Sequence, residues 1–250
     1  MHYLIKDTEF EIFLKVISKI KGLHSKNIPQ MRNFLEAVCY MARAGCPWRL
    51  LPKEYGFYRA IHRRFKRWSD MKVWEKIFEA LMQDPDMEYA MIDSTIVRAH
   101  ACSSGYKKNS QEQEALGRSR GGFSTKIHAI CDALGNPLKF ILTQGQRNDI
   151  TQAQALTESI FDIPLIGDKG YDSDDLRVYL KKKNCVPVIP PKENRLEQYE
   201  YDKYLYEDRN RIEGFFGKIK HFRRIFSRFD KAAQSFLSFV QFAGAMLWVR

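Results

Sequence analysis

The sequence predicts an α/β protein: a mixed β-sheet flanked by helices and preceded by a small all-α, helix-turn-helix-like domain. Apolar residues recur with helical spacing through residues 1–85, where strand signals are few. The spacing changes to strand-like alternation near residues 83–86. Beyond that point the segments follow the order strand, strand, strand, helix, strand, helix, strand, helix. We therefore expect a helical domain over residues 1–85 and an α/β domain over residues 86–250.

Composition limits the class of partner. The chain has 250 residues and a net charge of +11, which indicates a polyanionic partner, with nucleic acid first and an anionic membrane surface second. Its 44% of hydrophobic residues exclude a disordered basic tail. The five cysteines contain no C-x-x-C pair, which argues against a disulfide framework and a zinc site and fits a reducing cytoplasm.

Neither end of the sequence has the pattern of a membrane or export segment. The first ten residues include acids and lack a continuous apolar core, so they do not resemble a secretory signal. The most apolar run, residues 236–249, is too short to span a bilayer. It predicts a buried terminal helix.

The first domain contains a basic helix. A periodic run begins at Pro29 and ends at Gly45, and a turn-like link leads to a second predicted helix over residues 57–70. Basic side chains surround the apolar seam of this helix: Arg59, Arg63, Arg64, Lys66 and Arg67. Two interpretations stay open, reading of the DNA major groove and plain contact with phosphates.

The first strand of the second domain, residues 88–99, has Asp93 in its middle. Burying a carboxylate among apolar side chains is costly unless it has a partner, and a bound cation would supply one. The alternative is a side-chain bond to the neighbouring backbone. A Ser-, Gly- and base-rich loop follows over residues 101–122, in which Arg118 and Arg120 either contact phosphates or are simply solvated.

Two more strands, residues 123–132 and 137–145, are predicted to form a hairpin. With the Asp93 strand they give three consecutive strands, which we expect to be antiparallel. Asp149 directly precedes a helical run and is best interpreted as its N-cap, with catalysis the weaker interpretation.

A short apolar strand over residues 163–168 ends on Asp168, between Gly167 and Gly170. A carboxylate at the end of a buried strand is a common active-site placement in open α/β sheets. Three nearby acids introduce the next helix and favour its positive end instead: Asp172, Asp174 and Asp175. The prolines of residues 185–191 then predict a strand at the edge of the sheet.

Residues 206–220 carry the most specific pattern. On one helix, a single stripe would display Tyr206, Arg209, Glu213 and Lys220. A second, apolar stripe would contain Ile212, Phe215, Ile219, Phe222 and Phe226. An ordinary amphipathic helix with solvated charges is one interpretation. One glutamate isolated among cations favours the other, a metal ligand flanked by phosphate contacts.

The spacing of Tyr206, Arg209, Glu213 and Lys220 resembles the Y-R-E-K signature of DDE transposases of bacterial insertion sequences, of the insertion-sequence-five type. Asp93 stands at the first-Asp position of that family, and the D-K-G-Y element at Asp168 resembles its second-Asp block. The N-terminal pattern G-x-x-W-R-x-L-P also matches, at Gly45, Trp48, Arg49, Leu51 and Pro52. This resemblance implies a ribonuclease-H-like fold whose catalytic, metal-binding residues are Asp93, Asp168 and Glu213.

The implied chemistry is metal-dependent attack on a phosphodiester. Oxygen ligands favour Mg²⁺, with Mn²⁺ as a substitute, and two ions would activate a water or a 3′ hydroxyl. Repulsion among three carboxylates should leave the site poorly organised until a cation enters. We expect Arg209 to steady Glu213 or hold a phosphate, Lys220 to contact the DNA backbone, and His100 and His128 to be structural or near phosphates.

The function implied is a transposase that binds the terminal inverted repeats of its element as double-stranded DNA, cleaves at the ends and joins them to target DNA. A homodimer is expected, in the bacterial cytoplasm at the nucleoid, with no membrane partner. Two alternatives stay open: a metal-dependent nuclease on the same fold, and a catalytically silent DNA-binding protein derived from a transposase.

Overall fold

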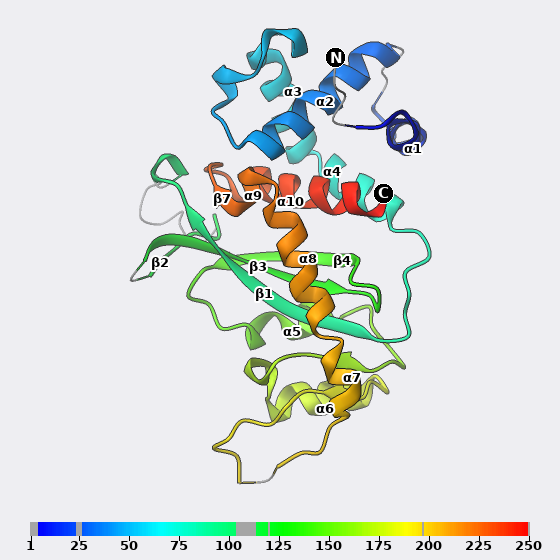
Figure 1. Cartoon of the computed structure of the whole chain (residues 1–250), viewed down its shortest axis with the longest axis vertical. Coiled ribbons are helices and arrows are strands. Elements are labelled where there is room, and N and C mark those ends of the chain that lie inside the picture. Colours follow the sequence, from blue (N-terminus) through cyan, green and yellow to red (C-terminus); the bar gives the residue numbers. More distant parts are fainter. Residues whose placement is uncertain (1–4, 24–26, 104–113, 120, 197, 250) are drawn as a thin grey trace. The chain divides into compact units, whose positions relative to one another are not determined.

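The computed structural model describes residues 5–23, 27–103, 114–119, 121–196 and 198–249 (Figure 1). It divides into two compact units. The helical unit comprises Met1–Gln83, Ala99–Lys107 and Ile219–Arg250, and the sheet unit comprises Asp84–Arg98 and Lys108–Lys218. Residues 219–250, which the sequence grouped with the α/β domain, thus lie in the helical unit. Among the described residues, no helix has the length and apolarity needed to cross a membrane.

The helical unit contains the predicted helices. Its α-helices are α1 (Asp7–Lys19), α2 (Ile28–Ala44), α3 (Tyr58–Asp70), α4 (Val73–Leu81), α9 (Arg223–Phe226) and α10 (Ala233–Trp248). Its short elements are η1 (Trp48–Leu50), η2 (Lys53–Tyr55), η3 (Ala101–Ser103) and β7 (Ser227–Arg228). Gly45 ends α2 at φ 62°, a left-handed conformation that glycine adopts without strain. The predicted buried terminal helix is confirmed as α10.

Aromatic rings fill the core of the helical unit. The ring centres of Trp68 and Trp74 are 5.1 Å apart, and Phe65 of α3 stacks on Phe239 of α10 with 4.4 Å between ring centres. The C-terminal helix therefore completes the core that α3 and α4 begin, which explains why residues 219–250 belong to this unit. Residues 45–57, which join α2 to α3, contain η1 and η2, so this connection is longer than the turn of a compact helix-turn-helix.

The sheet unit confirms the predicted mixed sheet. Its strands are β1 (Ala90–Ala99), β2 (Gly117–Ser119), β3 (Gly122–Cys131), β4 (Pro137–Gln144), β5 (Leu165–Ile166) and β6 (Pro187–Val188). They run in the order β2-β3-β1-β5-β6, with β4 also paired to β3. As predicted, β1, β3 and β4 are antiparallel, whereas β5 is parallel to both β1 and β6. β2 forms within the stretch expected to be a loop.

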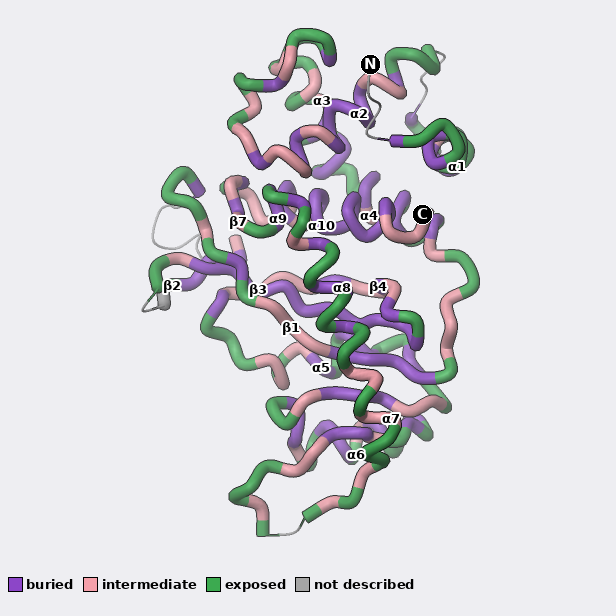
Figure 2. The backbone as a smooth tube through the Cα atoms, viewed as in Figure 1, coloured by how far each residue is buried: buried purple, intermediate pink, exposed green. Residues whose placement is uncertain are grey.

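The sheet separates two layers of helices. These helices are α5 (Ile150–Leu156), η5 (Lys169–Tyr171), α6 (Asp174–Lys182), α7 (Lys203–Glu207) and α8 (Asn210–Lys220). Phe215 of α8 stacks 5.9 Å from Phe140 of β4, and strand register aligns Phe140 with Ala129 and Asp93. α8 therefore covers the Asp93 face, and Figure 1 shows it crossing the strands. The opposite face packs on α5 through Ile92 and Ala153, and Figure 2 shows the central strands largely buried.

The prediction of one continuous helix from Tyr206 to Lys220 is wrong. α7 ends at Glu207 and α8 begins at Asn210, so Tyr206 and Arg209 precede the helix that carries Glu213. A distant contact holds the intervening turn, because the Tyr89 hydroxyl donates to Asp208 Oδ2 at 2.6 Å.

The predicted apolar stripe also stops early. α8 ends at Lys220, and the chain turns before α9 begins at Arg223. Phe222 is still buried, but Phe226 is 64% exposed and is not part of the core.

Candidate active site

Asp93 lies in the middle of β1 with only 16% of its side chain exposed. Its Oδ1 accepts a hydrogen bond from the Ser94 backbone N–H at 2.7 Å, and its Oδ2 lies 3.1 Å from Nη1 of Arg209. Burial raises the pKa of Asp93 to about 6; the Ser94 N–H and Arg209 oppose that rise, while Asp168 and Asp149 add to it. The backbone bond considered for this carboxylate is present, and so is a cationic partner.

Asp168 lies two residues beyond the end of β5, the strand that runs parallel to β1, so the strand predicted to end on Asp168 stops at Ile166. Its Oδ1 accepts from the Gly170 N–H at 2.9 Å, which caps the short helix η5. A Cβ added at Gly170 would lie 2.9 Å from the same Oδ1, so a side chain there would displace the Asp168 carboxylate. The charge of Asp168 helps raise the pKa of Asp93, which means that the two neighbouring strands bring these carboxyl groups near each other.

Glu213 is in the first turn of α8, with 54% of its side chain exposed. Its Oε1 accepts a hydrogen bond from Nη2 of Arg209. Arg209 therefore bridges Asp93 on the sheet and Glu213 on the helix that covers it. Side-chain contacts thus join Asp93, Arg209 and Glu213. Asp168 is connected to this group through its charge, which helps to raise the pKa of Asp93.

The donor set suits a hard divalent cation. Within the described ranges, no three His, Cys, Asp or Glu side chains are already gathered as a metal-binding group. The three candidates offer carboxylate oxygens only, which Mg²⁺ and Mn²⁺ prefer. Burial raises the pKa of Asp93 and two neighbouring acids add to the rise, even though Arg209 pairs with it, so added positive charge would be favourable there.

Asp149 does not have the role predicted for it. It stands at the N-cap position of α5, but its side chain makes no capping hydrogen bond. Its Oδ1 instead accepts from the Ser94 hydroxyl at 2.7 Å and lies 2.8 Å from Nζ of Lys126. The residue in the sequence that could have indicated this contact is Lys126. It is a charged residue in a strand of buried side chains, on the same face of β3 as His128.

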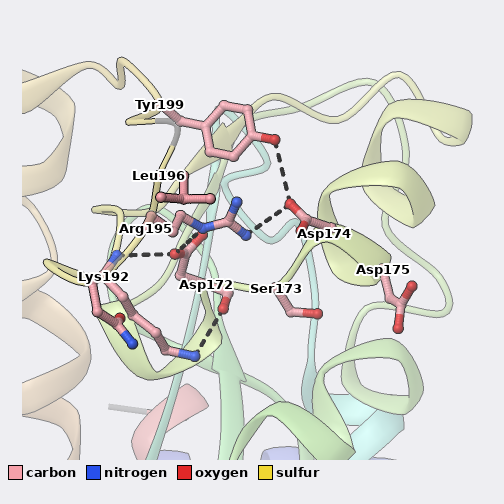
Figure 3. A pocket seen from close by; sticks show the side chains of 9 residues that line it. Asp172, Ser173, Asp174, Asp175, Lys192, Arg195, Leu196 and Tyr199 are labelled. Carbon is pink, nitrogen blue, oxygen red and sulfur yellow. Dashed lines mark hydrogen bonds and ion pairs between the residues drawn. The ribbon is translucent and has the colours of Figure 1, made fainter.

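The acids after Asp168 differ in their roles. Asp174 and Asp175 occupy the first turn of α6, as predicted, but Asp172 is buried. Although burial alone would raise it, hydrogen bonds from Lys192, Arg195 and Arg177 hold the pKa of Asp172 below its usual range. A pocket of about 750 Å³ adjoins this cluster (Figure 3). It is lined by Asp172, Ser173, Asp174, Asp175, Lys192, Asn194, Arg195, Leu196 and Tyr199.

The basic helix α3 presents most of its predicted DNA contacts to solvent. Arg59, Arg63 and Arg67 are exposed. Arg64 instead places its guanidinium 4.4 Å from the centre of the Phe34 ring and 5.2 Å from that of Trp68.

The remaining predicted DNA contacts are dispersed. Arg118 is exposed on β2, and Arg120 lies outside the described residues. Lys220 is the partly buried last residue of α8. Tyr206, which belongs to the Y-R-E-K pattern and is not among the predicted DNA contacts, packs its ring edge-on against that of Tyr201, with 5.5 Å between ring centres.

The two histidines have different surroundings. His128 is fully buried, and its Nε2 lies 2.7 Å from the Thr143 hydroxyl. Burial lowers the pKa of His128 to about 4. His100 is exposed, with Nδ1 3.1 Å from Sγ of Cys102. His128 therefore has a structural role.

Comparisons with known proteins agree with this architecture. Residues 5–78 match the family described as "Putative transposase of IS4/5 family", and residues 84–243 match the family described as "Transposase DDE domain". A Brucella ovis protein named "Putative transposase for insertion sequence element IS6501" is 36% identical over 129 residues, which are 51% of this chain and 99% of that protein.

Two further comparisons each cover part of this chain. A Burkholderia cepacia protein named "Putative transposase for insertion sequence element IS402" is 34% identical over 128 residues, covering 46% of this chain and 57% of that protein. A solved piggyBac transposase synaptic complex with hairpin DNA aligns with a TM-score of 0.42 and 16% identity, over 77% of this chain and 48% of that chain. The family match over residues 84–243 spans more than half of the sequence. The chain belongs to the DDE transposases of insertion sequences.

Proposed function

We propose that this transposase binds the terminal inverted repeats of its insertion sequence and catalyses metal-dependent strand cleavage and strand transfer. Asp93, Asp168 and Glu213 are its catalytic residues. The observation that carries the proposal is the bridge from Arg209 to both Asp93 and Glu213, which joins the sheet to the Y-R-E-K segment. The effect of Asp168 on the pKa of Asp93 supports its place beside them.

The three carboxylates would hold two Mg²⁺ ions, with Mn²⁺ as a substitute. Such a pair, when bound, activates the attacking oxygen and stabilises the leaving oxygen of an in-line displacement. The chain's own contribution is orientation. The Ser94 N–H and Arg209 fix the Asp93 carboxylate, and the Gly170 N–H fixes that of Asp168. Arg209 also orients Glu213 and is placed to pair with a DNA phosphate near the carboxylates.

DNA binding is assigned to residues 1–85 and to exposed basic side chains elsewhere in the chain. Arg59, Arg63 and Arg67 extend from α3 into solvent, and Arg118 is exposed on β2. The net charge of +11 favours such contacts with phosphates. A homodimer would handle the two ends of one element together, at the nucleoid of the bacterial cytoplasm.

The test uses the full chain and a labelled duplex that carries one end of the element, with an unlabelled target plasmid. Incubation with Mg²⁺, with Mn²⁺ and with a chelator should give metal-dependent cleavage at the end, followed by joined products. Cleavage without joining would assign the protein to the metal-dependent nucleases. Specific binding without cleavage in either metal would overturn the catalytic proposal.

A further inference from the structure

We propose that Asp149 is a positioning residue for the reaction. It holds Ser94 on one face of the sheet, and through Ser94 it fixes the Asp93 carboxylate on the other face. This inference rests on the proposed function, because it concerns the orientation of a proposed catalytic residue. The argument uses the two faces of β1, the contacts of Asp149 and the bond from Ser94 to Asp93.

The two faces of β1 have different neighbours. Successive side chains of a strand point to opposite faces, so Asp93 points toward Arg209 and α8, and Ser94 points the other way. Register pairs Ser94 with His128 of β3. Ser94 and His128 both face α5, and Asp149 stands directly before that helix. Asp149 therefore lies across the sheet from Arg209 and Glu213.

Asp149 is held in place by its own contacts. Its Oδ1 receives the Ser94 hydroxyl at 2.7 Å and lies 2.8 Å from Nζ of Lys126. Lys126 is only 8% exposed and also donates to the Arg147 carbonyl at 2.8 Å, which ties the segment before α5 to β3. An ion pair that is largely shielded from water, with a further hydrogen bond on the cation, holds its carboxylate in one geometry.

Ser94 transmits this geometry to the active site. Its hydroxyl bonds Asp149, and its backbone N–H bonds Asp93 Oδ1 at 2.7 Å. The rotamer of Ser94 and the direction of its N–H are thus fixed from the opposite face. Loss of Asp149 would leave the Ser94 hydroxyl without this acceptor and Lys126 without its anionic partner, and the backbone at Asp93 would lose a restraint.

The chain offers a matched control for a purely structural role. Lys139 of β4 also ties a strand to α5, since its Nζ donates to the Ala155 carbonyl at 2.7 Å and lies 3.6 Å from Glu158. None of these contacts involves Ser94. Lys139→Gln therefore removes a polar link between sheet and helix without touching the path to Asp93.

The experiment compares Asp149→Ala, Ser94→Ala, the double variant and Lys139→Gln in the full chain. It records Mn²⁺ binding by titration without DNA, kcat and KM for end cleavage, and Tm. Loss of an outer hydrogen-bonding partner of a metal ligand typically costs 10–100-fold in metal affinity or activity. Both variants keep the Ser94 N–H that bonds Asp93. We therefore expect Asp149→Ala and Ser94→Ala each to weaken Mn²⁺ binding and lower kcat at the lower end of that range, by up to about tenfold, with little change in KM.

Two further comparisons identify the path through Ser94. The double variant should be no worse than Asp149→Ala in Mn²⁺ binding, because both changes break the same path. Asp149→Asn should recover most of the Mn²⁺ affinity, because its amide oxygen can still accept from Ser94. Lys139→Gln should lower Tm and leave Mn²⁺ binding unchanged.

The inference is overturned if Asp149→Ala and Ser94→Ala bind Mn²⁺ as the wild type does, or if their effects on Mn²⁺ affinity add. Should Asp149→Ala fail to fold, Ser94→Ala alone decides, since it removes only a hydroxyl. If the wild type itself neither binds Mn²⁺ nor cleaves, the proposed function fails. A wild type that binds and cleaves, together with variants equal to it, refutes only the role of Asp149.

Discussion

Arg209 and Asp93 lie 116 residues apart in sequence, yet Nη1 of the arginine is 3.1 Å from Oδ2 of the aspartate. The same guanidinium bonds Glu213 from its other terminal nitrogen. One cation therefore neutralises part of the charge on two of the three proposed catalytic carboxylates. In the metal-free protein, Arg209 limits the repulsion that these acids would otherwise exert.

Arg209→Gln should make the fold more dependent on divalent metal. Removing the partner of a largely buried carboxylate should lower the free energy of unfolding without metal by about 1–3 kcal/mol. Added Mg²⁺ should then raise stability more in the variant than in the wild type, because no guanidinium competes for the same oxygens. Urea unfolding with and without Mg²⁺ measures both effects. Arg211→Gln, which loses an ion pair to Asp208 in the turn before α8, is the control; equal Mg²⁺ increments in both variants would contradict the prediction.

Acid should destabilise the protein through His128. Its pKa is about 4 in the folded chain, against an ordinary value of 6.5, because burial and Lys126 oppose the charged form more than Asp149 favours it. As pH falls below 6.5, His128 becomes protonated in the unfolded state but stays neutral in the folded state until about pH 4. The contribution of His128 to the free energy of unfolding should therefore fall over this interval by up to about 3 kcal/mol. Asp93 acts in the opposite direction, because its pKa is raised to about 6 in the folded chain.

Urea unfolding from pH 7 to pH 4 measures this effect. His128→Gln should lack the destabilisation by acid that His128 contributes, and the exposed His221→Gln should retain it. A profile with the same acid slope in wild type and His128→Gln would refute the assignment.

Gly170→Ala should impair cleavage more than folding. The new Cβ would lie 2.9 Å from Oδ1 of Asp168, so the carboxylate must move. Displacement of a catalytic group by a fraction of an ångström or more can cost about tenfold to a hundredfold in rate. Gly217→Ala is the control, because its added Cβ would meet nothing within 4 Å beyond the adjacent residues and backbone of its own helix, and alanine favours a helix. Cleavage rates and Tm are measured for both; a Gly170→Ala enzyme as fast as Gly217→Ala would contradict the proposed role of Asp168.

Two adjacent arginines of α3 should respond differently to substitution by glutamine. Arg63 is exposed, whereas the Arg64 guanidinium packs against Phe34 and Trp68. Arg63→Gln should weaken binding to the element end and reduce the slope of log affinity against log salt by about 1, the value for one lost phosphate contact. Arg64→Gln should lower Tm with little change in that slope. Binding titrations at several salt concentrations decide; equal slopes for Arg63→Gln and wild type would remove Arg63 from the DNA contacts.

Much of the sheet could be predicted because its signals are local. β1, β3 and β4 are long strands with clear boundaries, and the hairpin between β3 and β4 has its own turn residues. The Y-R-E-K spacing around Glu213 is likewise a local signal, although the single helix predicted from it is not formed. These features depend on residues that are neighbours in the sequence.

The rest depends on contacts between distant residues. The Tyr89 hydroxyl stabilises the break between α7 and α8 through its hydrogen bond to Asp208, and no pattern within residues 206–220 predicts this break. Asp149 has the local signal of an N-cap, but Ser94 and Lys126 bind its carboxylate instead. The placement of residues 219–250 in the helical unit similarly reflects aromatic packing of α10 on α3 and α4.

The central claim is that Glu213 is the third catalytic carboxylate, and the most direct measurement is metal-dependent end cleavage by Glu213→Gln beside Glu207→Gln. Both changes replace an exposed glutamate by its neutral isostere within the same segment, but only Glu213 contacts Arg209 in the arrangement described here. We predict that Glu213→Gln binds the end duplex and neither cleaves nor joins it with Mg²⁺ or Mn²⁺, while Glu207→Gln keeps the wild-type rate. Wild-type cleavage by Glu213→Gln would contradict the account.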